Sequence, residues 1–179
     1  TLGACHDAQD WVKEEVLRGS TDLEIWRAIP TPSWAVFPFR DNEDGKRLFT
    51  VVMECLGSLA PMVRPGLEEL DLWRRFDEIR GDCTTHFAKV GEGSYLIAQV
   101  RLSEAYGEEL AGMTYRILDT SATSYRTARY RTVQLLHEAL LYSPHVAMEQ
   151  ADLAVAYLPE EEAPDLVGIV QKHFTEEDF

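Results

Sequence analysis

The chain has 179 residues, of which 31 are Asp or Glu and 17 are Lys or Arg, so its formal net charge is −14. This length suits a single domain over residues 1–179 with one hydrophobic core, and 45% hydrophobic content with four tryptophans argues against disorder. A strongly negative field steers basic partners and performs no reaction by itself. The composition therefore favours an acidic binding protein over an enzyme.

The cysteines and the hydropathy pattern indicate a cellular location. Cys5, Cys55 and Cys83 are odd in number and widely spaced, with no CxxC pair, which argues against a disulfide framework and a zinc site. No basic stretch followed by an apolar one opens the chain, and no run approaches the roughly 20 apolar residues of a membrane span. We expect a soluble cytoplasmic protein with no membrane partner, of open oligomeric state.

The first 40 residues are predicted to form a helical pair and a proline-rich segment. Apolar residues recur at helical spacing over 4–17, and Gly19 ends this helix. A second helix is capped by one of residues 20–22, with Glu24 placed for a capping box. Three prolines keep 31–39 from forming one regular helix.

The middle of the chain is predicted to supply the centre of the fold. An acidic turn over 41–45 precedes a helix over 47–63 that is apolar on most faces, as a central bundle helix is. Residues 64–66 (RPG) are expected to break it. A further amphipathic helix is predicted over 67–80 and is closed by Gly81 and Asp82.

Residues 86–102 form the ambiguous region. Gly91 and Gly93 suggest a loop, and 95–102 suits strand or helix by local propensity. We favour helix, because no second strand is available to pair with it. Further helices are predicted over 96–118, 123–141, 145–157 and 165–174, with an acidic loop over 159–164. The chain is therefore predicted to be all-α, a compact single-domain bundle of about seven or eight helices.

The four tryptophans fall among the apolar residues of these segments. Trp11, Trp26, Trp34 and Trp73 are expected to contribute mostly to one core rather than to a binding face.

The histidines offer two candidate acid–base pairs. His6 is near Asp7 and Asp10, and His137 is next to Glu138. Each is interpreted more simply as a histidine near a helical carboxylate.

Other chemical motifs are absent from the sequence. His137 and His145 are eight residues apart across a proline, which does not match the i, i+4 spacing of a helical metal site. Cys55 lies on an apolar helix with no positive neighbour to lower its pKa. Residues 91–93 (GEG) are too short for a phosphate-binding loop. We predict no catalytic, cofactor-binding or metal-ligating residue, and no cofactor.

Residues 125–131 interleave three arginines with two tyrosines, which in a basic protein would suggest stacking on nucleic acid. In an acidic chain these arginines are expected to form ion pairs with carboxylates of neighbouring helices. We therefore expect no direct binding of nucleic acid.

The last 31 residues are the most acidic stretch, with nine acids against Lys172 alone. Such a run is either a solvated face or a docking patch for a basic surface, and both interpretations stay open. The candidate partner-binding residues are Asp41, Glu43, Asp44, Glu160, Glu161, Glu162 and Asp165.

Several separated segments carry a family resemblance. They are 4–11 (ACHDAQDW) with 23–28 (LEIWRA), 47–49 (RLF) leading to 54–56 (ECL), and 165–174 (DLVGIVQKHF). Together they resemble a family of all-helical proteins of bacteria and phages that is similar to the fifth-type immunity proteins of toxin systems. The chain departs from the family pattern at 32–38 (PSWAVFP), where only the Trp is shared, and over 95–130. The resemblance implies a helical fold and an immunity role, and it carries over no catalytic residue.

Three classes of function follow. The first is a cytoplasmic inhibitor or immunity-type protein that binds a toxin or defence effector and covers its site. The second is a phage-encoded nucleic-acid mimic, an anti-defence protein whose carboxylates imitate phosphates and block a nucleic-acid-binding protein. The third, an enzyme, is disfavoured because no chemical motif is found.

Overall fold

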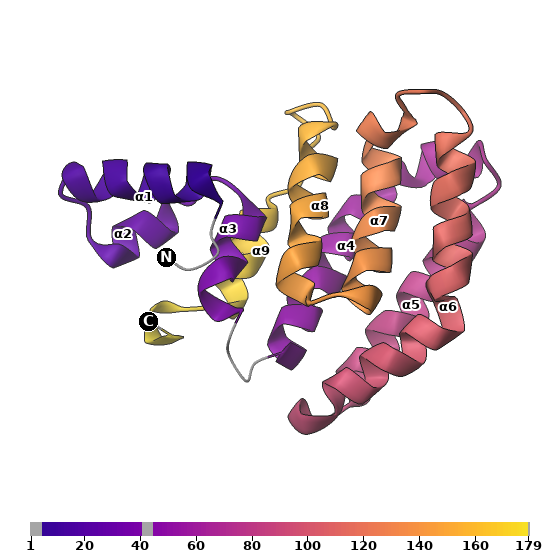
Figure 1. The fold of residues 1–179 in the computed structure, drawn as a ribbon, viewed down its shortest axis with the longest axis horizontal. Helices are drawn as coiled ribbons and strands as arrows, with labels where there is room; N and C mark the ends of the chain where they lie inside the picture. The colour runs from indigo at the N-terminus through magenta and orange to yellow at the C-terminus, as the bar shows by residue number, and fades with distance from the viewer. Residues whose placement is uncertain (1–4, 41–44, 179) are drawn as a thin grey trace.

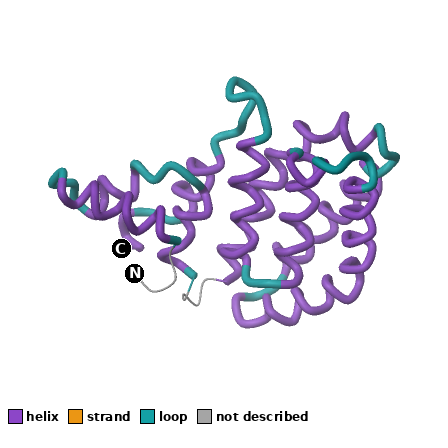
Figure 2. The backbone as a smooth tube through the Cα atoms, turned by 45° about the horizontal axis from the view of Figure 1, so that its top comes forward, coloured by secondary structure: helices purple, strands orange, loops and turns teal. Residues whose placement is uncertain are grey.

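The computed structural model describes residues 5–40 and 45–178, in which all regular structure is helical (Figures 1 and 2). This confirms the predicted all-α bundle. The described helices are α1 (His6–Leu17), α2 (Asp22–Arg27), α3 (Pro32–Val36), α4 (Gly45–Glu68), α5 (Trp73–Lys89), α6 (Tyr95–Leu118), α7 (Ala128–Leu141), α8 (Pro144–Ala156) and α9 (Leu166–His173). Short 3-10 turns lie at Phe37–Phe39, Glu92–Ser94, Ser124–Arg126 and Glu176–Asp178.

Helix α4 is the central element, as its apolar pattern predicts. It packs against α5, α7, α8 and α9, and Phe49, Leu56 and Leu59 on it are fully buried. By length and composition α4 is also apolar enough to cross a membrane, but 56% of the window that passes this test is buried inside the protein. In this fold α4 is therefore the core helix around which the others are arranged.

The predicted break of this helix at residues 64–66 is wrong. Helix α4 continues through Pro61 and Pro65 to Glu68. Both prolines are exposed, so the backbone carbonyls that lose a donor on that side can be satisfied by water. Val63 and Leu67 on the opposite side are buried, and their packing against the bundle outweighs the local cost of the two prolines.

The predicted limits of the next helix are also wrong. Helix α5 begins at Trp73, after a turn in which Asp71 has a φ of 57°. It continues through Gly81 to Lys89, because Cys83 and Phe87 extend the buried face that Phe76 begins. That apolar burial exceeds the roughly 1 kcal/mol that a glycine costs inside a helix.

The second half of the chain agrees closely with the predicted elements. Residues 95–102 form the start of α6, which confirms the choice of helix over strand. Helix α6 packs against α5 and α7, and α7 packs against α8. The predicted acidic loop over 159–164 joins α8 to α9 and lies at the top of Figure 1.

Helices α1 and α2 form a pair that extends to the left of the bundle in Figure 1. The predicted capping box is present, with Thr21 as the N-cap of α2 and Glu24 as its partner. The pair is anchored through α2, where Trp26 is 5% exposed and its carbonyl oxygen accepts a hydrogen bond of 3.0 Å from Gln171 of α9. In α1, by contrast, Ala8 is the one described residue that is buried.

The tryptophans divide between the core and the surface. Trp26 belongs to the core, and Trp73 is partly buried against it. Trp11 and Trp34 lie outside the core and are partly buried against each other, with ring centroids 6.1 Å apart. The expectation of one shared core is therefore wrong for Trp11 and Trp34, because α1 packs beside the bundle rather than into it.

Candidate functional site

The candidate partner-binding acids fall into three groups, the last of which is Asp165 alone. Asp41, Glu43 and Asp44 lie outside the described residues. Residues 160–162, three consecutive glutamates, are exposed in the loop between α8 and α9, and none forms an ion pair with a described residue. This loop is called the acidic loop below.

Asp165, the last of these acids, has a structural role. It is the N-cap of α9, and its Oδ1 accepts a hydrogen bond of 2.8 Å from the backbone N–H of Gly168. An acidic N-cap of this kind stabilises a helix by satisfying a free N–H and by complementing the helix dipole. Helix capping alone accounts for an aspartate at this position.

Two further acids of the C-terminal stretch are held by internal contacts. The carboxylate of Asp178 accepts hydrogen bonds from Arg47, at 2.8 Å, and from the backbone N–H of Thr175, at 2.7 Å. These contacts lower the pKa of Asp178, the Thr175 hydrogen bond most. Asp152 of α8 is partly buried and hydrogen-bonded to Ser33 of α3. The predicted acidic patch is therefore only partly a free surface.

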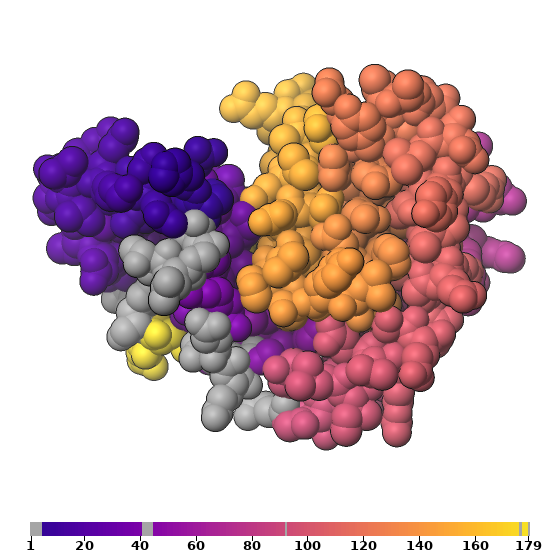
Figure 3. Space-filling model, in the orientation of Figure 1, coloured from indigo at the N-terminus to yellow at the C-terminus, as the bar shows by residue number. Residues whose placement is uncertain are grey.

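A hollow of the described surface lies between α1, α3 and α8. It is a groove of about 570 Å³, a volume typical of binding sites. In Figure 3 the indigo N-terminal helices are separated from orange α8 by a notch, with the loop after α8 above it. The apolar groove, as it is called below, is defined by Trp11, Val12, Val16, Trp34, Phe37 and Val146.

The groove is apolar because α1 turns its hydrophobic stripe toward it. Ala8, Trp11, Val12 and Val16 follow the helical spacing i, i+3, i+4 and i+8, and all four line the groove. Val12 is 40% exposed and Val16 is 56% exposed, so this face is largely uncovered. An amphipathic helix normally buries such a face against another element.

The charged residues at the groove are mostly acidic. Lys13 lies 2.8 Å from Asp10, which neutralises it locally. Asp22 and Glu149, which also line the groove, form no ion pair with a described residue. The helix that carries Glu149 lies in a stretch with no Lys or Arg at all, from residue 132 to residue 171.

A partly buried carboxylate lies beneath the groove, where α3 meets α8. The Asp152 carboxylate accepts hydrogen bonds from the backbone N–H of Ser33, at 3.0 Å, and from the Ser33 hydroxyl. Burial raises the pKa of Asp152 from 3.8 to about 6, the nearby charge of Glu149 adds to this rise, and the Ser33 hydrogen bonds oppose it. Asp152 thus caps α3, whose own N-cap residue makes no side-chain hydrogen bond.

The histidine pairs of the sequence are not assembled into a catalytic arrangement. His6 is exposed, and the carboxylate of Asp10 is engaged by Lys13. Burial lowers the pKa of His137, and its neighbour Glu138 accepts hydrogen bonds from glutamines rather than from the histidine. No group of three or more metal-ligating side chains occurs among the described residues.

Cys55 lies on the apolar helix α4, as the sequence predicts. Cys55 and Cys83 are buried, and burial raises the pKa of each thiol to about 12. Such thiols are poor nucleophiles. Cys5 is exposed and is the N-cap of α1, where its Sγ accepts a hydrogen bond of 3.4 Å from the Ala8 N–H.

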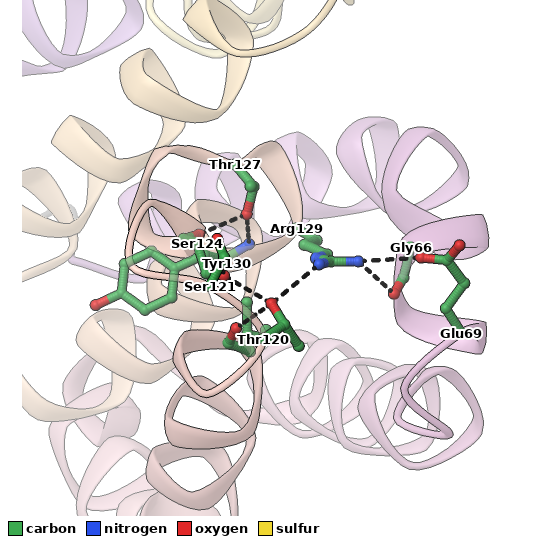
Figure 4. A network of polar contacts seen from close by, with 9 residues as sticks. Gly66, Glu69, Thr120, Ser121, Ser124, Thr127, Arg129 and Tyr130 are labelled. Carbon is green, nitrogen blue, oxygen red and sulfur yellow. Dashed lines mark hydrogen bonds and ion pairs between the residues drawn. The ribbon is translucent and has the colours of Figure 1, made fainter.

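The arginines of residues 125–131 are bound mostly within the protein. Arg129 donates to the Gly66 carbonyl and lies 3.2 Å from Glu69, as Figure 4 shows. Arg131 donates to the amide oxygen of Gln150 rather than to a carboxylate. The interpretation of these arginines as partners of neighbouring carboxylates thus fits Arg129 and not Arg131.

The sequence predictions missed the apolar groove. Helical spacing over 4–17 places Trp11 in a core stripe, because periodicity identifies an apolar face but not what covers it. The available signal was Trp34, an aromatic residue in a proline-rich segment too short to form a long core helix.

Comparisons of this chain with protein-family models, with curated proteins and with solved structures found no match. The resemblance to immunity proteins therefore stays a hypothesis.

Proposed function

We propose that this chain is a cytoplasmic binding protein that inhibits a basic toxin or defence effector, as immunity proteins do. The observation that carries the proposal is the acidic loop. Glu160, Glu161 and Glu162 are consecutive and exposed, form no ion pair with a described residue, and lie in a stretch of 40 residues that has no Lys or Arg. Carboxylates that serve the fold of this protein, such as Asp178, have partners. The acidic loop is instead available to another molecule.

Inhibition by such a protein needs no chemistry of its own. A basic effector is steered toward the acidic loop by the long-range field and is then held by short-range contacts that cover its functional site. Exposed charges raise the rate of encounter more than they raise the affinity. The short-range contacts therefore have to come from a surface other than the acidic loop.

Affinity capture tests the proposal directly. The wild-type protein and the triple variant E160Q/E161Q/E162Q serve as matched baits, and captured proteins are identified by mass spectrometry. We expect the wild type to enrich a protein with a basic surface, and the purified partner to lose its activity on addition of one equivalent of this chain. A partner that binds both baits equally and keeps its activity in the complex would contradict the proposal.

A further inference from the structure

The apolar groove is lined by aromatic and aliphatic side chains of α1, α3 and α8. Its aromatic wall is formed by Trp11 of α1 and Trp34 of α3, and its opposite wall includes Val146 of α8, which is 40% exposed. Tryptophan is among the residues that most often dominate the binding energy of a protein interface. The groove therefore has the composition of a binding site.

The shape of the groove favours a helical occupant. Its walls are helices, and the described part of the chain contains no strand whose edge an extended peptide could join. A helix laid between α1 and α8 would bury the stripe of Val12 and Val16, as a helix-in-groove complex does.

The charges at the groove favour a cationic occupant. Asp22 of α2 and Glu149 of α8 both line it without ion-pair partners among the described residues, and Lys13 is already paired with Asp10. A basic residue on the rim of the bound helix could pair with Asp22 or with Glu149, neither of which has a described ion-pair partner. An acidic one would meet like charge.

We propose that the apolar groove binds a cationic amphipathic helix of the partner protein, with apolar side chains between Trp11 and Trp34 and with Lys or Arg beside Asp22 and Glu149. This inference rests on the proposed function, since it names the surface that supplies the short-range contacts.

A second copy of this chain is a poor occupant by the same reasoning. Each copy carries a net charge of −14, so association is opposed by repulsion. Helix α1 itself, the exposed amphipathic helix, carries Asp7, Asp10, Glu14 and Glu15 against Lys13, and would place acids against Asp22 and Glu149.

The test uses a fluorescein-labelled 18-residue peptide of Leu and Lys, ordered as an amphipathic helix, and a control peptide of identical composition with no apolar face. Fluorescence anisotropy gives the dissociation constants. The groove variant V16Q is matched by V100Q on α6, because both valines are 56% exposed and Val100 does not line the groove. The rim variant E149Q is matched by E104Q, also an exposed glutamate.

We expect the amphipathic peptide to bind at least tenfold more tightly than the control peptide. V16Q should weaken its binding at least fivefold and V100Q less than twofold, and E149Q should weaken binding at low salt more than E104Q does. Circular dichroism verifies that each variant is folded, and V12Q repeats the groove test at a second residue. Equal effects of V16Q and V100Q would overturn the inference, as would equal binding of the two peptides.

Other occupants give different results. A concentration-dependent dimer in sedimentation velocity that V16Q abolishes would assign the groove to a second copy. An apolar dye that binds the groove while the peptide does not would assign it to a small ligand. Either result overturns the inference.

The inference and the proposed function fail separately. If V16Q and V100Q bind a captured effector equally well, the groove is not part of the interface. The inhibitor role is then unaffected. If the groove binds the peptide but no effector is inhibited, the inhibitor role fails and the groove remains a binding site for a cationic helix.

Discussion

The carboxylate of Asp152 on α8 caps helix α3 by accepting a hydrogen bond of 3.0 Å from the backbone N–H of Ser33, 119 residues earlier in the chain. The contact joins the element that carries Trp34 to the element that carries Glu149, and so fixes the two sides of the apolar groove relative to each other.

The partial burial of Asp152 predicts a specific pH dependence. Because its pKa rises from 3.8 to about 6 on folding, the folded state binds the proton more tightly than the unfolded state does. The contribution of Asp152 to stability therefore falls as pH rises from about 4 to about 6, by roughly 2–3 kcal/mol. D152N, which keeps an acceptor for the Ser33 N–H, should remove this loss.

Urea denaturation of the wild type and of D152N at pH 4, 5, 6 and 7 measures the effect. Between about pH 4 and about pH 6, the free energy of unfolding of D152N should rise relative to that of the wild type. Above about pH 6 the difference between the two proteins should stay constant. D119N removes one exposed carboxylate on the surface and serves as the control. A difference between wild type and D152N that does not change with pH would contradict the buried, proton-binding environment.

The polar network of Arg129 should contribute measurably to stability. Arg129 is 20% exposed and donates to the Gly66 carbonyl of α4 and to the Thr120 hydroxyl after α6, so one side chain joins three segments (Figure 4). R129A should cost about 1–3 kcal/mol, since it leaves a partly buried carbonyl unpaired. E69Q should cost far less, because Glu69 is 75% exposed. Equal costs in chemical denaturation would show that the ion pair, not the backbone contact, is what matters.

The C-terminal segment is held by an aromatic stack. Phe174, at the end of α9, lies against Phe39 with ring centroids 3.9 Å apart and an interplanar angle of 10°, and both are buried. F174A should lower the free energy of unfolding by about 3–5 kcal/mol through lost burial and a residual cavity. Y115A, at a tyrosine that is 68% exposed, should change it by less than about 0.5 kcal/mol. A denaturation midpoint for F174A that matches the wild type would place this ring outside the core.

The acidic loop should act on the rate of association with a basic partner. E160Q/E161Q/E162Q should lower the on-rate more than it changes the off-rate, and added salt should slow the wild type, because ions screen exposed charges beyond about 8–10 Å. The variant E104Q/E108Q/D119N makes the same change in net charge, from −14 to −11, elsewhere on the surface.

Surface plasmon resonance at several salt concentrations compares the two triple variants with the identified partner. A larger on-rate loss for the acidic-loop variant locates the steering charge at that loop. Identical losses would mean that net charge alone is responsible. The acidic loop would then be interpreted as a solvated face rather than as a docking patch.

Local signals in the sequence determined most of the helical architecture. Thr21 and Glu24 form the predicted capping box because both partners lie within one helical turn. The apolar pattern of α4 predicted its central place because a helix that is apolar on most faces has to be surrounded. Asp165 begins α9 for a similarly local reason, as a carboxylate that caps a free N–H.

Only the tertiary structure decided where local preference was overruled and which apolar face stayed open. Helix α4 passes Pro61 and Pro65, and α5 passes Gly81, because their buried faces gain more from packing than the backbone loses. Val12 and Val16 look like core residues by spacing, yet they border a groove because α1 docks beside the bundle. Periodicity specifies that a face is apolar, whereas the element that covers it is set by contacts between distant segments, such as that of Ser33 with Asp152.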